Sequence, residues 1–135
     1  MSRSGYSDEM DDTWALIRWR GAVESALRGR RGQALLRDLI TALDAMPEKR
    51  LIQGELQAGS EVCALGAIGR MRGIDMAKMD PEDYERVAPL FGIAEALARE
   101  VMYENDEGDY LETPERRWER MRKWALDNLA IGARP

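Results

Sequence analysis

Apolar positions recur with a helical period along most of the chain, and one segment departs from that pattern. From Val62 to Gly69 the sequence has no polar residue, and a helix that is apolar on all sides belongs in the interior of a fold. Glu61 can begin this helix and Gly73 can end it. Gly66 indicates that another helix backbone packs closely against it, because an interior glycine costs a helix about 0.5–1 kcal/mol relative to alanine. We therefore predict a central buried helix over about 61–73.

The first helix is predicted over residues 13–28, with Asp12 or Thr13 as its cap. Its predicted core face, at helical spacing, comprises Leu16, Trp19, Val23, Ala26 and Leu27. Trp14 and Ile17 fall on another side of this helix, near Arg18. Either they form an exposed apolar patch rimmed by arginine, or Trp14 packs against the N-terminal segment or a later helix.

The second helix is predicted from Gln33 to about Ala45 and ends before Pro47, which excludes helical geometry from the residue ahead of it. Its predicted core face comprises Leu35, Leu36, Leu39, Ala42, Leu43 and Met46. The segment Arg28-Gly29-Arg30-Arg31-Gly32 is predicted to be a tight turn that joins the two helices into an antiparallel hairpin.

The remaining elements follow from caps and periodicity. Residues 47–60 fit either a short helix or an extended connector, and residues 74–79 are predicted to be irregular. Asp80-Pro81 is a typical helix start, and this helix should present Tyr84, Val87, Ala88 and Phe91 to the core and end at Gly92. Another helix is expected from Ile93 to about Glu104, with Glu95, Arg99 and Glu100 on its polar face.

The last helix is predicted to start at Thr113-Pro114 and to end near residue 131. Its predicted buried face comprises Trp118, Met121, Trp124, Ala125 and Leu129. The sequence thus predicts an all-α fold: a compact bundle of about five to six helices around the central apolar helix. We expect one domain over 13–131, preceded by a flexible acidic tail over 1–12 and followed by a frayed end over 132–135.

Composition narrows the class of protein. The chain of 135 residues has one cysteine and no histidine, so an internal disulfide, His-based catalysis and Cys/His zinc sites each lack a required part. The N-terminus has no apolar signal-peptide core and no apolar run is long enough to span a membrane. The sequence therefore predicts a cytoplasmic protein with no catalytic residue, no cofactor and no metal.

Charge is distributed unevenly along the chain. Between Arg18 and Arg37 there are six arginines and one acid, a local charge of +5 in a chain of net charge −5. Such a segment either binds a polyanion or pairs with the protein's own carboxylates. The candidate residues for contact with nucleic acid or another anion are Arg18, Arg20, Arg28, Arg30 and Arg31. No known DNA-binding motif accompanies them.

The acidic segment from Asn105 to Glu112 invites comparison with a calcium loop. If Gly108 stood at the loop's invariant glycine, Tyr103 would occupy the first ligand position and Pro114 the position of the bidentate glutamate. The register fails, so we interpret this segment as an acidic turn between helices.

Five segments of the chain are distinctive as a set: Ile17-Arg18-Trp19-Arg20-Gly21, the Arg28–Gly32 segment, Val62-Cys63-Ala64-Leu65-Gly66-Ala67, Tyr103-Glu104-Asn105-Asp106-Glu107 and Thr113-Pro114-Glu115-Arg116-Arg117-Trp118. Together they resemble a family of short, uncharacterised proteins encoded by tailed bacteriophages and prophages, and the resemblance covers most of residues 14–129. It implies a phage origin and the cytoplasm of a bacterial host. It transfers no reaction and no catalytic residue.

Three functions are compatible with these observations. The first, which we expect, is a non-enzymatic phage accessory protein that binds a host or phage protein through a surface patch containing Trp14 and Ile17, and so modulates a host process or defence. The second is binding of a nucleic-acid backbone by the basic helical hairpin over 18–37. The third is an enzyme, for which the sequence presents no assembled nucleophile, base and anion stabiliser.

Overall fold

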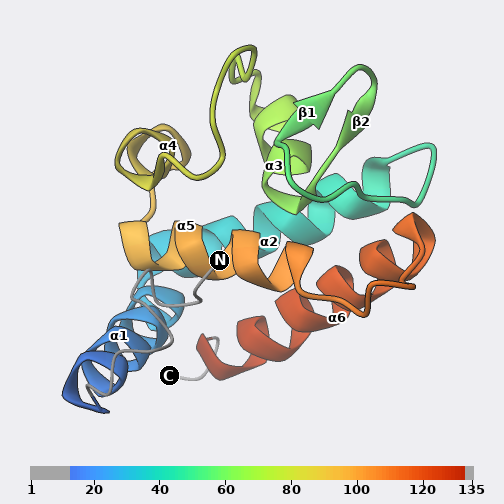
Figure 1. The fold of residues 1–135 in the computed structure, drawn as a ribbon. Helices are drawn as coiled ribbons and strands as arrows, with labels where there is room; N and C mark the ends of the chain where they lie inside the picture. The colour runs from blue at the N-terminus through green and yellow to red at the C-terminus, as the bar shows by residue number, and fades with distance from the viewer. Residues whose placement is uncertain (1–12, 133–135) are drawn as a thin grey trace.

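The computed structural model describes residues 13–132, which form six α-helices and one short β-hairpin (Figure 1). The elements, in chain order, are α1 (Thr13–Arg28), α2 (Arg30–Ala45), β1 (Gln57–Ala58), β2 (Glu61–Val62), α3 (Ala64–Arg72), α4 (Tyr84–Phe91), α5 (Glu95–Asp106) and α6 (Pro114–Gly132). The predicted all-α bundle is confirmed. The tail predicted over 1–12 lies outside the described residues, as do 133–135 of the predicted frayed end.

The apolar segment occupies the middle of the fold, as predicted. Every residue from Val62 to Gly69 is buried, and α3 packs between α2 and α5. The helix is shorter than predicted, however, because Glu61 and Val62 pair with β1 in an antiparallel hairpin. Cys63 caps α3 instead, its Sγ accepting a hydrogen bond from the Gly66 amide at 3.3 Å. Gly73 ends α3 in the left-handed conformation, as predicted.

Gly66 is a site of close backbone approach, but its neighbour is the extended segment before β1 rather than the helix that we predicted. A Cβ added at Gly66 would lie 1.8 Å from the carbonyl oxygen of Leu56, the residue before β1. The same oxygen accepts a hydrogen bond from the Cys63 amide at 3.2 Å. The absence of a side chain at Gly66 therefore lets the extended segment lie directly on α3.

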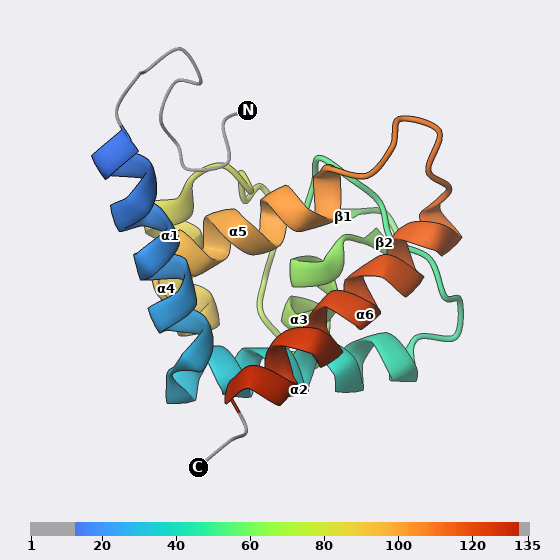
Figure 2. The ribbon, with the colours of Figure 1, turned by 90° about the horizontal axis from the view of Figure 1, so that it is seen from below.

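The connection between α1 and α2 differs from the predicted five-residue turn. Only Gly29 separates the two helices, and Arg30, Arg31 and Gly32 already belong to α2. An antiparallel hairpin of helices needs a loop of about two to five residues. With one residue between them, α1 and α2 form a corner and cross steeply (Figure 2), so the predicted antiparallel arrangement over 18–37 is wrong.

The core face of α2 is buried at every predicted position, and that of α1 differs from the prediction at its first turn. Ala15, Trp19, Val23 and Leu27 form the buried stripe of α1 at steps of four residues. Leu16 shares this side of the helix by spacing but has 46% of its surface exposed, so the assignment of Leu16 to the core is wrong. The α1 helix packs against α5 and α2 with the Trp19 stripe inward.

Residues 47–60 are extended rather than helical, and polar side chains from distant helices hold them in place. Asn105, buried at the end of α5, donates to the Ile52 carbonyl at 2.9 Å and accepts from the Ala64 amide at 3.0 Å. Arg117 of α6 is 4% exposed and donates to the Leu51 carbonyl at 2.9 Å. These backbone groups would otherwise be buried without partners.

The starts of the later helices were predicted with mixed success. Thr113 caps α6 as predicted, its Oγ1 accepting from the Arg116 amide at 3.1 Å. The predicted start at Asp80-Pro81 is wrong, because the Asp80 carboxylate accepts from the Glu82 amide in a local turn and α4 begins only at Tyr84. Glu100, assigned to the polar face of α5, is buried.

Candidate functional site

The outward face of α1 carries large apolar side chains that the described part of the fold leaves exposed. Trp14 is 70% exposed and Ile17 is 53% exposed. Gly21 lies one turn further along the same face, and a Cβ added there would meet no atom within 4 Å. Because the other side of α1 supplies the buried stripe, this face points away from the core. Trp14 and Ile17 are thus exposed in the described structure, and the alternative that Trp14 packs against the N-terminal segment falls on residues 1–12, outside the described part of the chain.

The predicted arginines lie along α1 and at the corner that follows it. Arg18, Arg20, Arg28, Arg30 and Arg31 are all exposed. At about 100° per residue, Arg18 and Arg20 fall on opposite flanks of the outward face, and Arg28 lies on its centre line. Arg30 and Arg31 are in the first turn of α2. The structure thus brings Trp14, Ile17 and Arg28 onto one face and gathers three arginines at one corner.

These arginines make few ion pairs within the chain. The Arg28 guanidinium lies 3.6 Å from the Glu24 carboxylate, with both side chains about two-thirds exposed, so this pair is weak. Arg18, Arg20, Arg30, Arg31 and Arg37 form no ion pair with a described residue. Among the described residues, internal pairing of this basic segment is therefore limited to Arg28 with Glu24.

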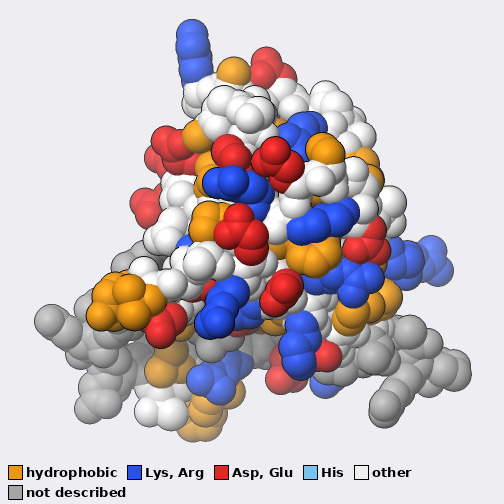
Figure 3. Space-filling view, turned by 90° about the vertical axis from the view of Figure 1, so that its right-hand side faces the viewer, with side chains coloured by type: hydrophobic (Ala, Val, Ile, Leu, Met, Phe, Trp, Pro, Cys, Tyr) orange, Lys and Arg blue, Asp and Glu red, His pale blue; other side chains and the backbone are white. Residues whose placement is uncertain are grey.

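Arginines of α6, by contrast, form ion pairs with carboxylates of other segments. Glu112 is held by Arg120 at 2.7 Å and by Arg117 at 3.4 Å, and Asp44 is held by Arg122 at 2.7 Å. The hydrogen bond from Arg120 lowers the pKa of Glu112, and the hydrogen bond from Arg122 lowers the pKa of Asp44. On the right-hand side of Figure 1, basic and acidic side chains accordingly lie beside one another (Figure 3).

The start of α2 concentrates positive charge where a helix least favours it. Its first turn has no acidic residue, and Gly29 provides no side-chain cap. The partial positive charge of a helix N-terminus favours anions and disfavours arginine. Two arginines at this position, beside Arg28, make a corner suited to phosphate or carboxylate oxygens.

The corner is held in a defined shape by residues that the sequence did not single out. The buried Gln33 side chain donates from Nε2 to the Leu27 carbonyl at 2.6 Å and to the Asn128 carbonyl at 3.4 Å. A Cβ added at Gly32 would lie 1.9 Å from the Ala26 carbonyl oxygen. Gln33 and Gly32 therefore fix the end of α1 against α2 and α6. The sequence could not show this, because one partner of Gln33, Asn128, comes from the distant helix α6.

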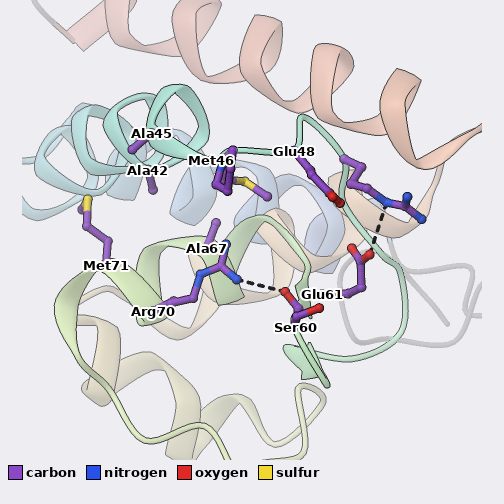
Figure 4. A pocket seen from close by; sticks show the side chains of 11 residues that line it. Ala42, Ala45, Met46, Glu48, Ser60, Glu61, Ala67, Arg70 and Met71 are labelled. Carbon is purple, nitrogen blue, oxygen red and sulfur yellow. Dashed lines mark hydrogen bonds and ion pairs between the residues drawn. The ribbon is translucent and has the colours of Figure 1, made fainter.

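A hollow of about 470 Å³ lies between α2, the β-hairpin and α3. Its floor is apolar and includes Met46, Ala67 and Met71. Figure 4 shows Arg70 of α3 directed across it toward Ser60, whose carbonyl accepts from Nη1 at 3.0 Å. Arg50 lies 3.3 Å from Glu61 on the same rim. The Arg50 guanidinium and the Glu61 carboxylate thus neutralise each other on the rim. Among the described residues that line the hollow, no hydrogen bond joins a nucleophilic side chain to a base, as a catalytic pair would require.

The structure provides no activated nucleophile at the cysteine. Cys63 is fully buried in the core, and burial raises the pKa of its thiol to about 12, so it stays protonated at neutral pH and is not reactive. Within residues 13–132, no three acidic or cysteine side chains come together in a group that could hold a metal ion.

Comparisons with protein-family models, with curated proteins and with solved structures gave no match to this chain. The resemblance to phage-encoded proteins therefore stays a prediction. In the described part of the chain, none of the helices combines the length and the apolar character that a membrane crossing requires.

Proposed function

We propose that this protein is a non-enzymatic phage accessory protein that binds a host or phage protein in the bacterial cytoplasm through the outward face of α1. One observation carries the proposal: Trp14, 70% exposed, and Ile17, 53% exposed, lie beside Arg18, which forms no ion pair with a described residue. Tryptophan and arginine are the residues that contribute most often to binding energy at protein interfaces.

The first experiment measures which proteins the tagged chain retains from a bacterial lysate, with and without Trp14→Ala and Ile17→Ala together. We expect the double variant to lose its partner, because truncating an interface tryptophan typically costs about 2 kcal/mol or more of binding energy. Leu111→Ala is the matched control, since Leu111 is 72% exposed but lies in the loop between α5 and α6. An unchanged set of partners in the double variant would discard this face as the contact surface.

A second candidate function, binding of a nucleic-acid backbone, is favoured by the corner itself. Arg28, Arg30 and Arg31 stand together at the start of α2, and no acid in its first turn neutralises them. If they contact phosphates, affinity for DNA should fall steeply as salt concentration rises, because each contact releases bound counterions.

Arg30→Ala with Arg31→Ala should then weaken binding to DNA and flatten the plot of log affinity against log salt by about 0.9 for each phosphate that is no longer neutralised. Arg86→Ala, an exposed arginine on α4, is the control and should leave the slope unchanged. If the unaltered protein is not retained on DNA or RNA even at low salt, nucleic-acid binding is removed from consideration.

A further inference from the structure

The outward face of α1 has a spacing that is typical of a helix packed along another helix. Trp14, Gly21 and Arg28 are spaced seven residues apart. Ile17 lies three residues after Trp14, and Glu24 lies three residues after Gly21. Side chains at this spacing form a single seam along a helix. The buried stripe of α1 lies on the other side, so this seam faces outward and is available to a partner helix.

Gly21 lies at the centre of this seam, and no packing contact with a described residue accounts for its missing side chain. It lies in the middle of a 16-residue helix and is exposed, and nothing lies within 4 Å of the position of a Cβ. By contrast, Gly32 and Gly66 are explained by backbone atoms less than 2 Å from that position. The missing side chain at Gly21 permits a second helix backbone to approach closely at the middle of α1.

The two halves of the seam complement each other. The half before Gly21 carries the large apolar side chains Trp14 and Ile17, and the half after it carries Ser25 and the cation Arg28. Trp14 and Arg28 are each seven residues from Gly21. If two such helices cross in opposite directions at Gly21, each Trp14 ring lies over the Arg28 guanidinium of the other copy, a favourable pairing of cation and aromatic face.

Charge along one edge of the seam supports the same arrangement. Arg20 and Glu24 lie on the same flank of α1 by helical spacing. In a two-fold antiparallel pair equal flanks adjoin, so Arg20 of one copy comes within reach of Glu24 of the other. A parallel pair would instead bring Arg28 of one copy against Arg28 of the other.

We propose that this face of α1 binds the same face of a second copy of the chain, in an antiparallel two-fold pair centred on Gly21. The inference rests on the proposed function in one respect, that this face is a binding surface, and it names the partner as the protein itself. Arg30 and Arg31 stay outside the contact. One helix face about 24 Å long is a small interface, so the dimer is weak, with a dissociation constant on the order of micromolar.

Sedimentation of the full chain from micromolar to near-millimolar concentration tests self-association. We expect a shift from monomer to dimer with rising concentration. Ile17→Glu should raise the dissociation constant of this dimer at least tenfold, because each of the two copies then places a carboxylate in the apolar part of the seam. Leu111→Glu, the same kind of change on a loop at the other side of the molecule (Figure 2), should leave the association unchanged.

Cross-linking tests the geometry, since the one native cysteine is buried. Gly21→Cys should form a disulfide-linked dimer under mild oxidation many times faster than Leu111→Cys. Trp14→Cys mixed with Arg28→Cys should cross-link several times more than either variant alone. A protein that stays monomeric at all concentrations, or a Trp14→Cys variant that links to itself more than to Arg28→Cys, overturns the proposed pair.

The outcomes separate this inference from the proposed function. If the protein is monomeric and still retains a lysate protein that Trp14→Ala with Ile17→Ala releases, the self-pairing is overturned and the proposed function stands. If it is monomeric and the double variant retains the same proteins as the unaltered chain, both are overturned.

Discussion

At the scale of the residue, the atoms around each glycine show how closely parts of this molecule approach one another. Gly66 is in contact with a backbone carbonyl that cannot move without displacing the β-hairpin, while Gly21 faces open space. Gly69 is intermediate, since its nearest neighbours are the side chains of Met76 and Phe91. The same amino acid is therefore required for packing at one position and not at another.

We expect Gly66→Ala to lower the free energy of unfolding by about 1–3 kcal/mol or more, because the added methyl group overpacks a backbone contact. Gly21→Ala should raise it by about 0.5–1 kcal/mol, the gain in helix propensity where no clash opposes it. Urea unfolding at dilute protein concentration measures both. A Gly66→Ala variant as stable as the unaltered protein would contradict the contact with Leu56.

At the scale of the element, α2 combines a well-packed core face with an unfavourable first turn. Seven of its residues are buried, and this packing stabilises the helix despite Arg30 and Arg31 at its positive end. Residues that oppose the local preference of an element are expected at functional sites. If the start of α2 binds a phosphate backbone, as the second candidate function proposes, binding and stability make opposite demands there.

The Arg30→Ala with Arg31→Ala variant of the salt titration should accordingly unfold at the same or a higher urea concentration. Each arginine removed from a helix N-terminus relieves about 0.3–1 kcal/mol of unfavourable interaction with the helix dipole at low salt. Loss of DNA binding together with undiminished stability would identify the corner as a contact surface. A clear loss of stability would show that these side chains support the fold instead.

At the scale of the whole molecule, one carboxylate connects segments that are far apart in the sequence. The Glu112 side chain, 8% exposed, pairs with Arg117 and Arg120. Arg117 also donates to the Leu51 carbonyl and to Gln53, and Arg120 donates to the carbonyls of Glu104 and Asn105 at the end of α5. Glu112 therefore positions the two arginines that join α6 to α5 and to the extended segment.

Glu112→Gln should lower the free energy of unfolding by about 3 kcal/mol at pH 7, because the buried Arg117 would be left without its counter-charge. Arg120 lowers the pKa of Glu112 below its ordinary value of 4.5. The stability from this carboxylate is therefore fully present above pH 4.5 and is lost as the pH falls through the lowered pKa. The difference between the two proteins should shrink on acidification. Urea unfolding at pH 7 and pH 3 measures this, with the exposed Glu107→Gln as control.

Local patterns predicted much of the helical structure. The core face of α2, the ends of α3 at Gly73 and of α4 at Gly92, and the cap of α6 at Thr113 depend on residues within one or two turns. For the candidate site, the sequence proposed Trp14, Ile17 and five arginines, and the structure shows that all of them are exposed. It left open whether other parts of the chain cover or neutralise them, because that depends on residues up to a hundred positions away.

Periodicity and composition were enough to predict about five to six helices, the burial of Val62 to Gly69 and a basic segment between positions 18 and 37. The corner at Gly29, the β-hairpin, the burial of Arg117 and the exposure of Leu16 became known only from the three-dimensional fold. Each of these depends on contacts between distant segments. A helix forms through hydrogen bonds between residues four positions apart, so local sequence is enough to predict it. Which face of α1 is buried and which stays exposed depends on how helices from distant parts of the sequence pack against it.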